Sequence, residues 1–176
     1  MPNLSQIFAI KLLTLTNDCP IVCFVNKSIL KTYSEVLPMK TRTLNGTWTL
    51  EIPGTPFAAV PATVPGSVYH DLLAAERIPD PFYRDNEMEA LKLMDNDFVY
   101  FRSFQVDDAL LAGDKVLLRA EGLDTIAAVH INGQIVGEAC NMHRIWEFDV
   151  KSVLHPGENT ITVSFRSPTK YIKEAY

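Results

Sequence analysis

The sequence predicts an all-β protein: an antiparallel β-sandwich of the jelly-roll kind with one short helix. Three observations support this prediction. Short segments that alternate apolar and polar residues follow one another from Thr47 onward, and turn residues separate them at short intervals. The dipeptide Asn132-Gly133 then joins two such segments, and it is the strongest short signal for a two-residue hairpin turn. Many short strands with frequent turns are typical of β-sandwiches.

Alternation locates the strands one by one. The segment 57–64 contains prolines, which suit an edge strand or a loop. In 97–106, Phe98 and Tyr100 fall on one face that Arg102 interrupts. In chain order, the expected strands are residues 47–52, 57–64, 97–106, 115–122, 125–131, 134–137, 146–150 and 160–167.

The expected helix lies at residues 67–77. Ser67 can cap its N-terminus, and Val68, Leu72 and Ala75 fall on one face at helical spacing. The last residues of the chain, SPTKYIKEAY, show neither a turn nor a closing strand. We therefore expect a sandwich that is incomplete at its C-terminus, with an unpaired strand edge.

The chain divides at Met39. Residues 1–38 mix apolar runs with polar breaks and show no sustained period, whereas MKTRTLNGTW from Met39 reads like a natural start followed by a strand. We expect residues 1–38 to be an extension outside the core fold and residues 39–176 to form the sandwich. Deleting the extension should then leave the melting temperature unchanged.

Composition excludes several classes of function. The 176 residues carry a net charge of −5, which provides neither a basic patch for nucleic acid nor a polybasic stretch for a membrane surface. No apolar run approaches the length of about 18 residues that a membrane-spanning helix needs. Residues 7–15 are apolar but contain Lys11 and lack a basic lead-in, so they make a poor signal peptide. We therefore expect a cytoplasmic protein.

The cysteines suggest no disulfide framework. Cys19 and Cys23 have no second cysteine pair or nearby histidine to complete a zinc site, and Cys140 lies far along the chain. Free thiols in a reducing compartment are the simplest interpretation. The sequence contains no metal, phosphate or nucleotide motif, so we expect no cofactor.

One polar segment, 80–97, is rich in carboxylates. A glycosidase needs two carboxylates about 5 to 10 Å apart across a sugar, but so many acids in one loop meet that condition by chance, and a solvated acidic loop is the simpler interpretation. Pro79 and Pro81 restrict the backbone, while Phe82 and Tyr83 can either pack the loop or stack on a sugar. The acids are Asp80, Asp85, Glu87, Asp95 and Asp97.

Several motifs, in this order, resemble the N-terminal sugar-binding domain of family 2 glycoside hydrolases, and the β-mannosidase branch in particular. The similarity runs from about Leu44 to Pro168. The segments IPDPFYRDNE and EGLDT are its most specific parts; the others are LNGTW, VPGSVYHDLL, INGQIVG, NMHRIWEFDV and PGENTITVSF.

This resemblance implies a galactose-binding-domain-like jelly roll within a much longer enzyme. Immunoglobulin-like domains and a catalytic (β/α)₈ barrel would follow, and two glutamates of the barrel would act by the retaining mechanism. Those domains and a carbohydrate are the implied partners, and this chain alone should be inactive.

The resemblance also implies substrate contacts in the full-length enzyme, at Asn86, Glu87 and Asp80. For Asn86 the alternative is an Asx-type turn hydrogen bond. Two other functions stay open: a free-standing carbohydrate-binding module, or a fragment of a related β-galactosidase or β-glucuronidase.

Overall fold

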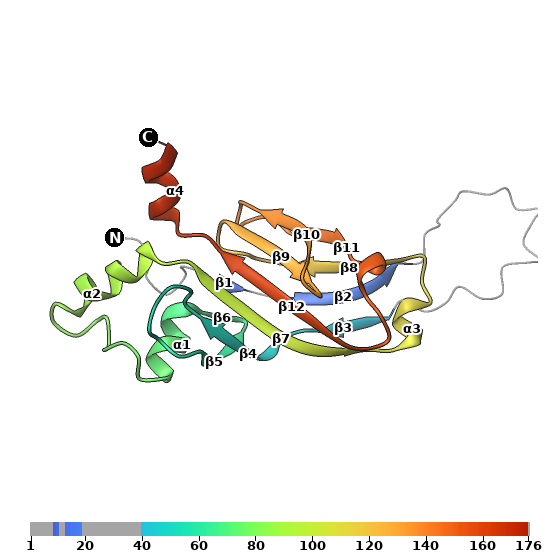
Figure 1. The fold of residues 1–176 in the computed structure, drawn as a ribbon, viewed down its shortest axis with the longest axis horizontal. Coiled ribbons are helices and arrows are strands. Elements are labelled where there is room, and N and C mark those ends of the chain that lie inside the picture. The colour runs from blue at the N-terminus through green and yellow to red at the C-terminus, as the bar shows by residue number, and fades with distance from the viewer. Residues whose placement is uncertain (1–8, 11–12, 19–39, 176) are drawn as a thin grey trace, which may run out of the picture.

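The computed structural model describes residues 9–10, 13–18 and 40–175. A six-stranded and a four-stranded antiparallel sheet pack face to face (Figure 1), which confirms the predicted sandwich. The first sheet has the order β10 (Gln134–Ala139), β9 (Ala127–Ile131), β12 (Gly157–Phe165), β7 (Phe98–Val106), β4 (Gly46–Glu51), β5 (Val60–Val64). The second has the order β11 (Trp146–Asp149), β8 (Lys115–Ala120), β2 (Leu13–Asp18), β3 (Thr41–Thr43), and β1 (Ala9–Ile10) pairs with β6 (Gly66–Ser67).

The pair β7–β12 forms the centre of the larger sheet. Its register is unbroken from Gly157 opposite Val106 to Phe165 opposite Phe98. Alternate side chains of both strands are buried, as the pattern in the sequence predicted, because one face of the sheet covers the core. β5 is an edge strand, which leaves room for Pro61.

The second sheet corrects the predicted extension. β2 comes from the N-terminal segment, yet it pairs with β8 on one side and with β3 on the other, and Leu15 is fully buried. The prediction that residues 1–38 lie outside the core fold is therefore wrong for Leu13–Asp18. Their alternation, LTLT, is too short to stand out among the apolar residues around it. Cys19 and Cys23 lie outside the described residues.

The predicted hairpin is confirmed. Asn132 and Gly133 have φ angles of 50° and 78°. Such positive values are what this tight turn requires, and β9 and β10 pair on either side of it. The pairing slips between Ile135 and Gly137, as a β-bulge does. This bulge brings β10 towards β11 at the edge of the other sheet.

The prediction of a single helix is wrong. Helix α1 (Val68–Ala74) is the expected one, and the hydroxyl of Ser67 caps it by accepting from the His70 amide at 3.4 Å. The described residues hold three more α-helices and two 3₁₀ turns, and none of these helices is long and apolar enough to cross a membrane. They are α2 (Asn86–Lys92), α3 (Asp108–Leu111), α4 (Pro168–Ala175), η2 (Leu93–Asp95) and η3 (Lys151–Val153).

Candidate functional site

The predicted substrate contacts lie in the loop after α1 and in the first turn of α2, at one end of the sandwich (Figure 1). Asn86 begins α2, and its Nδ2 donates to the backbone carbonyl of Asp80 at 2.9 Å. The Asp80 carboxylate accepts instead from the Phe82 amide, also at 2.9 Å. The structure thus brings Asp80 and Asn86 together, with Glu87 half-buried as the next residue of α2. Asp80, rather than Asn86, makes the Asx-type bond.

The same segment exposes apolar side chains. Phe82 is 78% exposed and Tyr83 57%, so neither ring packs inside the loop, whereas Pro81 is buried. Met88 and Leu91 follow on α2 and are 64% and 42% exposed; their spacing of three places them on one face of the helix. We call Phe82, Tyr83, Met88 and Leu91 the α2 surface. Four large exposed apolar side chains within residues 82–91 make this segment a candidate contact site.

A buried tyrosine fixes α2 against α1. Tyr69 lies on α1, and its hydroxyl donates to the carbonyl of Ala90 in α2 at 2.8 Å. Burial raises the pKa of Tyr69 to about 12, so the hydroxyl keeps its proton and stays a donor at neutral pH. Met88 and Leu91 of the α2 surface are therefore presented by a helix that is tied to α1.

A second polar network fastens α4 to η2 and to the residue before β7. Ser167 is fully buried; its amide donates to Asp97 at 2.8 Å, and its hydroxyl donates to the carbonyl of Met94. Thr169 donates to Asp95 at 2.7 Å, and this bond, with Lys173 nearby, lowers the pKa of Asp95. The sequence analysis missed this network. The dipeptide Ser167-Pro168, a cap followed by the favoured first helical residue, could have revealed α4.

A carboxylate lies inside the core. Asp71 of α1 is 3% exposed, and its two oxygens accept from the amide of Thr63 at 3.1 Å and from the hydroxyl of Tyr100 at 2.9 Å. Burial raises the pKa of Asp71 more than these bonds lower it. A group that joins three elements inside the core has a structural role, because substrate cannot reach it.

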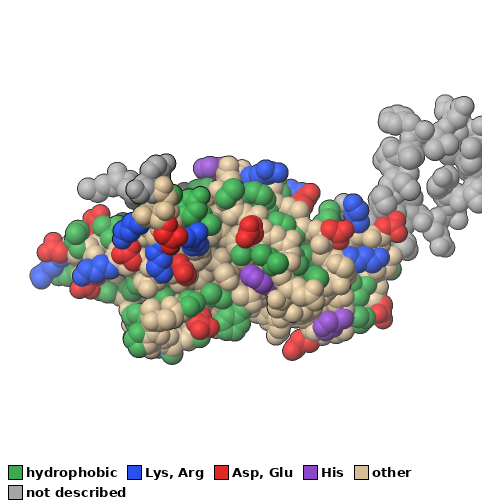
Figure 2. Space-filling model, turned by 45° about the horizontal axis from the view of Figure 1, so that its top comes forward, with side chains coloured by type: hydrophobic (Ala, Val, Ile, Leu, Met, Phe, Trp, Pro, Cys, Tyr) green, Lys and Arg blue, Asp and Glu red, His purple; other side chains and the backbone are tan. Residues whose placement is uncertain are grey.

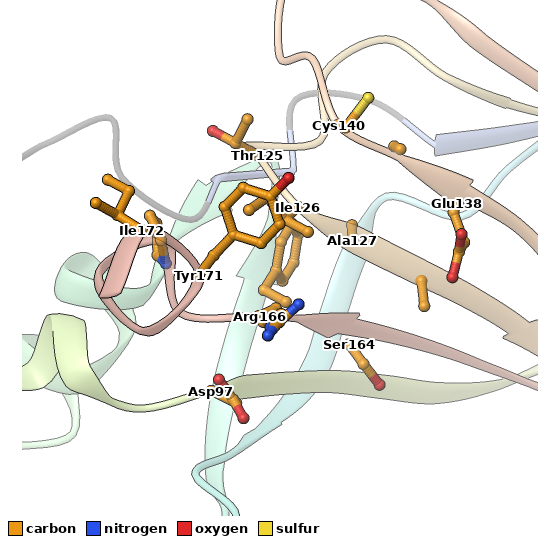
Figure 3. A pocket seen from close by; sticks show the side chains of 14 residues that line it. Asp97, Thr125, Ile126, Ala127, Glu138, Cys140, Ser164, Arg166, Tyr171 and Ile172 are labelled. Carbon is orange, nitrogen blue, oxygen red and sulfur yellow. The ribbon is translucent and has the colours of Figure 1, made fainter. Parts of the chain in front are cut away.

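A cavity of about 1070 Å³ lies where β9, β10 and β12 meet α4 (Figure 3). Tyr171 and Ile172 of α4 are 48% and 57% exposed beside it, and small residues such as Ala127 and Ala128 form its floor. Arg166 at its rim is ion-paired with Glu174. This lining suits an apolar group better than a free sugar, whose hydroxyls need several convergent polar partners.

Charge does not single out a site on the face shown in Figure 2, where acidic and basic side chains are interspersed. Within residues 9–10, 13–18 and 40–175, no three His, Cys, Asp or Glu side chains are placed to hold a metal ion. Cys140, at the cavity, is an exposed free thiol. The sites that stand out are therefore the α2 surface and the cavity beside α4.

Comparison with known families identifies this architecture. Residues 42–176 match the family described as the glycosyl hydrolase 2 galactose-binding domain-like domain. The chain belongs to this family. The matched range includes the α2 surface, the Asp80–Asn86 contact and the cavity, so all three are features of a family 2 glycosyl hydrolase domain.

Among its relatives are β-mannosidases. The chain is 33% identical to β-mannosidase from Bos taurus over 131 residues, which are 74% of this chain and 15% of the bovine protein. The crystal structure of β-D-mannosidase from Dictyoglomus thermophilum matches with a TM-score of 0.72 and 37% identity over 75% of this chain and 16% of that one. The family 2 domain thus spans about one sixth of these relatives.

A β-glucuronidase is also similar. The Bifidobacterium dentium enzyme, in complex with coumarin-3-O-glucuronide, matches with a TM-score of 0.50 and 32% identity over 69% of this chain and 19% of that one. Both its TM-score and its identity are lower than those of the β-mannosidase structure, so this chain is more similar to the β-mannosidase.

Proposed function

We propose that this chain is the N-terminal, non-catalytic domain of a β-mannosidase-like exoglycosidase. The intact enzyme would remove terminal β-linked mannose by the retaining mechanism, in which one glutamate is the nucleophile and another the acid/base. The observation that carries the proposal is the identity of 33% and 37% to two β-mannosidases, of which the chain spans 15% and 16%.

In this enzyme the domain supports the rest of the molecule. The α2 surface and the cavity beside α4 are the contact sites for the immunoglobulin-like domains and the catalytic barrel. The exposure of Phe82 and Met88 favours this role, because both would bury large apolar areas on docking. The bond from Tyr69 to Ala90 holds α2 in place, so little order is lost when the surfaces meet.

The loop before α2 and the first turn of this helix line one side of the sugar site. Asn86, Glu87 and Asp80 are the proposed substrate contacts. The bond to Asp80 uses one of the two amide protons of Asn86, so the same side chain can hold the loop and bind a hydroxyl of the sugar. Carbohydrate is thus a partner of the assembled enzyme.

A chimeric enzyme tests the proposal. The chain replaces the structurally matching domain of the Dictyoglomus β-D-mannosidase, and hydrolysis of an aryl β-mannoside and an aryl β-glucuronide is measured. We expect the chimera to cleave the mannoside and the chain alone to cleave neither. Turnover by the chain alone would overturn the non-catalytic role, and a folded chimera without mannosidase activity would overturn the assignment. Restored activity in a matching β-glucuronidase chimera would favour that enzyme.

One observation favours a second function, a free-standing carbohydrate-binding module. The ring of Phe82 is 78% exposed, and exposed rings can stack on sugars. Isothermal titration of the chain with mannose, galactose and glucuronic acid separates the two functions. A domain that needs the barrel should give no dissociation constant below the millimolar range, whereas a binding module should give a tighter one that Phe82→Ala weakens.

A further inference from the structure

The position of β2 within the four-stranded sheet is unusual. β2 lies between β8 and β3 and runs antiparallel to both, so its two neighbours are parallel to each other and pair only through it. The register places Leu15 opposite Leu118 of β8, and both side chains are fully buried. One strand therefore completes the backbone pairing on two sides and part of the core.

The family match includes the neighbours of β2 but not β2. It covers residues 42–176, with all of β8 and nearly all of β3. Without β2, β3 and β8 of this chain would be two parallel strands separated by a gap of two interstrand spacings, each about 4.8 Å. We call this gap the β3–β8 slot. In this chain a segment from outside the matched range fills it.

An empty slot would be costly. The facing edges of β3 and β8 would present unpaired amides and carbonyls, which invite pairing with any available strand. Leu118 would lose its cross-strand neighbour Leu15 and part of its cover. The backbone groups of β3 and β8 can pair with an extended segment of almost any sequence. Only the buried position opposite Leu118 requires a particular kind of side chain, an apolar one.

We propose that the β3–β8 slot is a strand-acceptor site whose ligand is an extended peptide that runs antiparallel to both edges and places an apolar side chain opposite Leu118. Leu13–Asp18 occupies it as an exchangeable strand, and a peptide of the same sequence supplied separately can take its place. Neighbouring positions are tolerant, since Thr14 is half-buried and lies opposite Arg119. The proposal is independent of the enzymatic assignment.

The test uses the full chain with Leu15→Asp, which places an unpaired carboxylate in the core and expels β2. Thr14→Asp is the matched control, because it adds the same charge to the adjacent residue, opposite Arg119. Amide hydrogen exchange is followed in β3 and β8, and in β7 and β12 as the reference. We expect protection in β8 to fall by about tenfold or more in Leu15→Asp and to change little in Thr14→Asp.

The peptide Leu-Thr-Leu-Thr-Asn-Asp, the sequence of residues 13–18, is then added to Leu15→Asp, and a peptide with aspartate in place of both leucines is added in parallel. Recovery of β3 and β8 protection with the native peptide alone supports the acceptor site, whether the variant has opened locally or throughout. Absence of recovery, recovery with the peptide that lacks both leucines, or unchanged protection in Leu15→Asp would overturn it. A dimer that restores protection without peptide would also overturn it, since a second copy would then be the occupant.

Discussion

Gly137 of β10 lies directly against the ring of Phe148 in β11: a β-carbon on Gly137 would overlap Cδ1 and Cε1 of that ring. These two strands are edges of different sheets. Their close approach closes one side of the sandwich, and it depends on the bulge between Ile135 and Gly137. This closure therefore requires glycine at position 137, because any larger side chain would overlap the ring.

Gly137→Ala should destabilise the protein by about 1–3 kcal/mol, because the added methyl group forces the ring of Phe148 or the strand to move. Urea unfolding measures the loss. Phe148→Leu serves as the coupled control, since a smaller side chain makes room for the methyl group. The double variant should lose less than the sum of the two single losses. Strict additivity would contradict the steric explanation.

The bond between Asp71 and Tyr100 supports a second prediction. Asp71→Ala leaves the Tyr100 hydroxyl and the Thr63 amide without their acceptor. The variant should lose about 1–3 kcal/mol for each orphaned group. Asp71→Asn should lose less, because an amide keeps an acceptor for Thr63 and can donate to the Tyr100 oxygen. Thermal unfolding of both variants measures the difference, and equal losses would argue against this network.

Asp71 also predicts a pH dependence. The pKa of Asp71 in the folded protein is raised above the ordinary value of 3.8, because the core favours the protonated form. The stabilisation by protonated Asp71 is therefore complete below pH 3.8 and is lost as the pH rises through the pKa of the folded protein. The stability of Asp71→Asn relative to the native protein should therefore increase over this window and then level off. Urea unfolding across about pH 3 to 7 measures it. A difference that falls with pH would contradict the raised pKa.

The hairpin turn depends on one asparagine. Asn132 Nδ2 donates to Val153 at 2.9 Å and to Asn159 at 2.8 Å, while its Oδ1 accepts from the Thr160 amide at 2.9 Å. Asn132→Ala removes these bonds but keeps a β-carbon on a residue with positive φ. We therefore expect the free energy of unfolding to fall by about 2–4 kcal/mol. Asn132→Gly removes only the bonds and should lose less. Thermal unfolding distinguishes them; a larger loss for glycine would refute the backbone contribution.

The cap of α4 can be tested locally. The Ser167 hydroxyl accepts from the Lys170 amide at 3.1 Å and donates to Met94. Ser167→Ala should cost about 1 kcal/mol and speed amide exchange in α4 before the sheets are affected. Ser152→Ala, at an exposed position, is the control. Equal exchange in α4 for both variants would exclude a capping role.

The proposed substrate contact is tested in the chimeric enzyme. Asn86→Ala should lower kcat/KM for the aryl β-mannoside by about tenfold, the value of one hydrogen bond strengthened in the transition state. Asn96→Ala is the matched control, because Asn96 also donates to a backbone carbonyl, that of Leu93 at 3.3 Å. Circular dichroism checks that both fold. Equal losses would assign Asn86 a purely structural role.

The strands were predictable because alternation is local. β7 shows this, and it also shows what a local pattern does not indicate. The sequence places Arg102 on the inward face, but not its partners: its guanidinium donates to the carbonyls of Leu44 and Asn45 at 2.9 and 3.0 Å and lies 5.8 Å from the ring of Trp48. Such partners are distant in the chain, and only the folded sheet brings them together.

The helices and the site show why the rest was not predictable. The many acids of residues 80–97 favour a polar loop, although Glu87 and Glu89 in the first turn of α2 and Lys92 in its last fit a helix. The contact between Asp80 and Asn86 needs a turn in which Arg84 adopts a φ of 53°. No local pattern indicates that conformation, which is uncommon for a residue other than glycine. The sequence therefore suggested Asp80 and Asn86 as candidates, and their role stays a prediction, but it did not indicate their geometry.

The unbroken ladder between β7 and β12 has a mechanical consequence. The two strands run antiparallel side by side over their full length, nine residues each. Tension applied along the strand axis would load every rung at once in shear, whereas tension across the sheet would break the rungs one after another. A domain built around this pair would resist stretching in one direction far better than in the other.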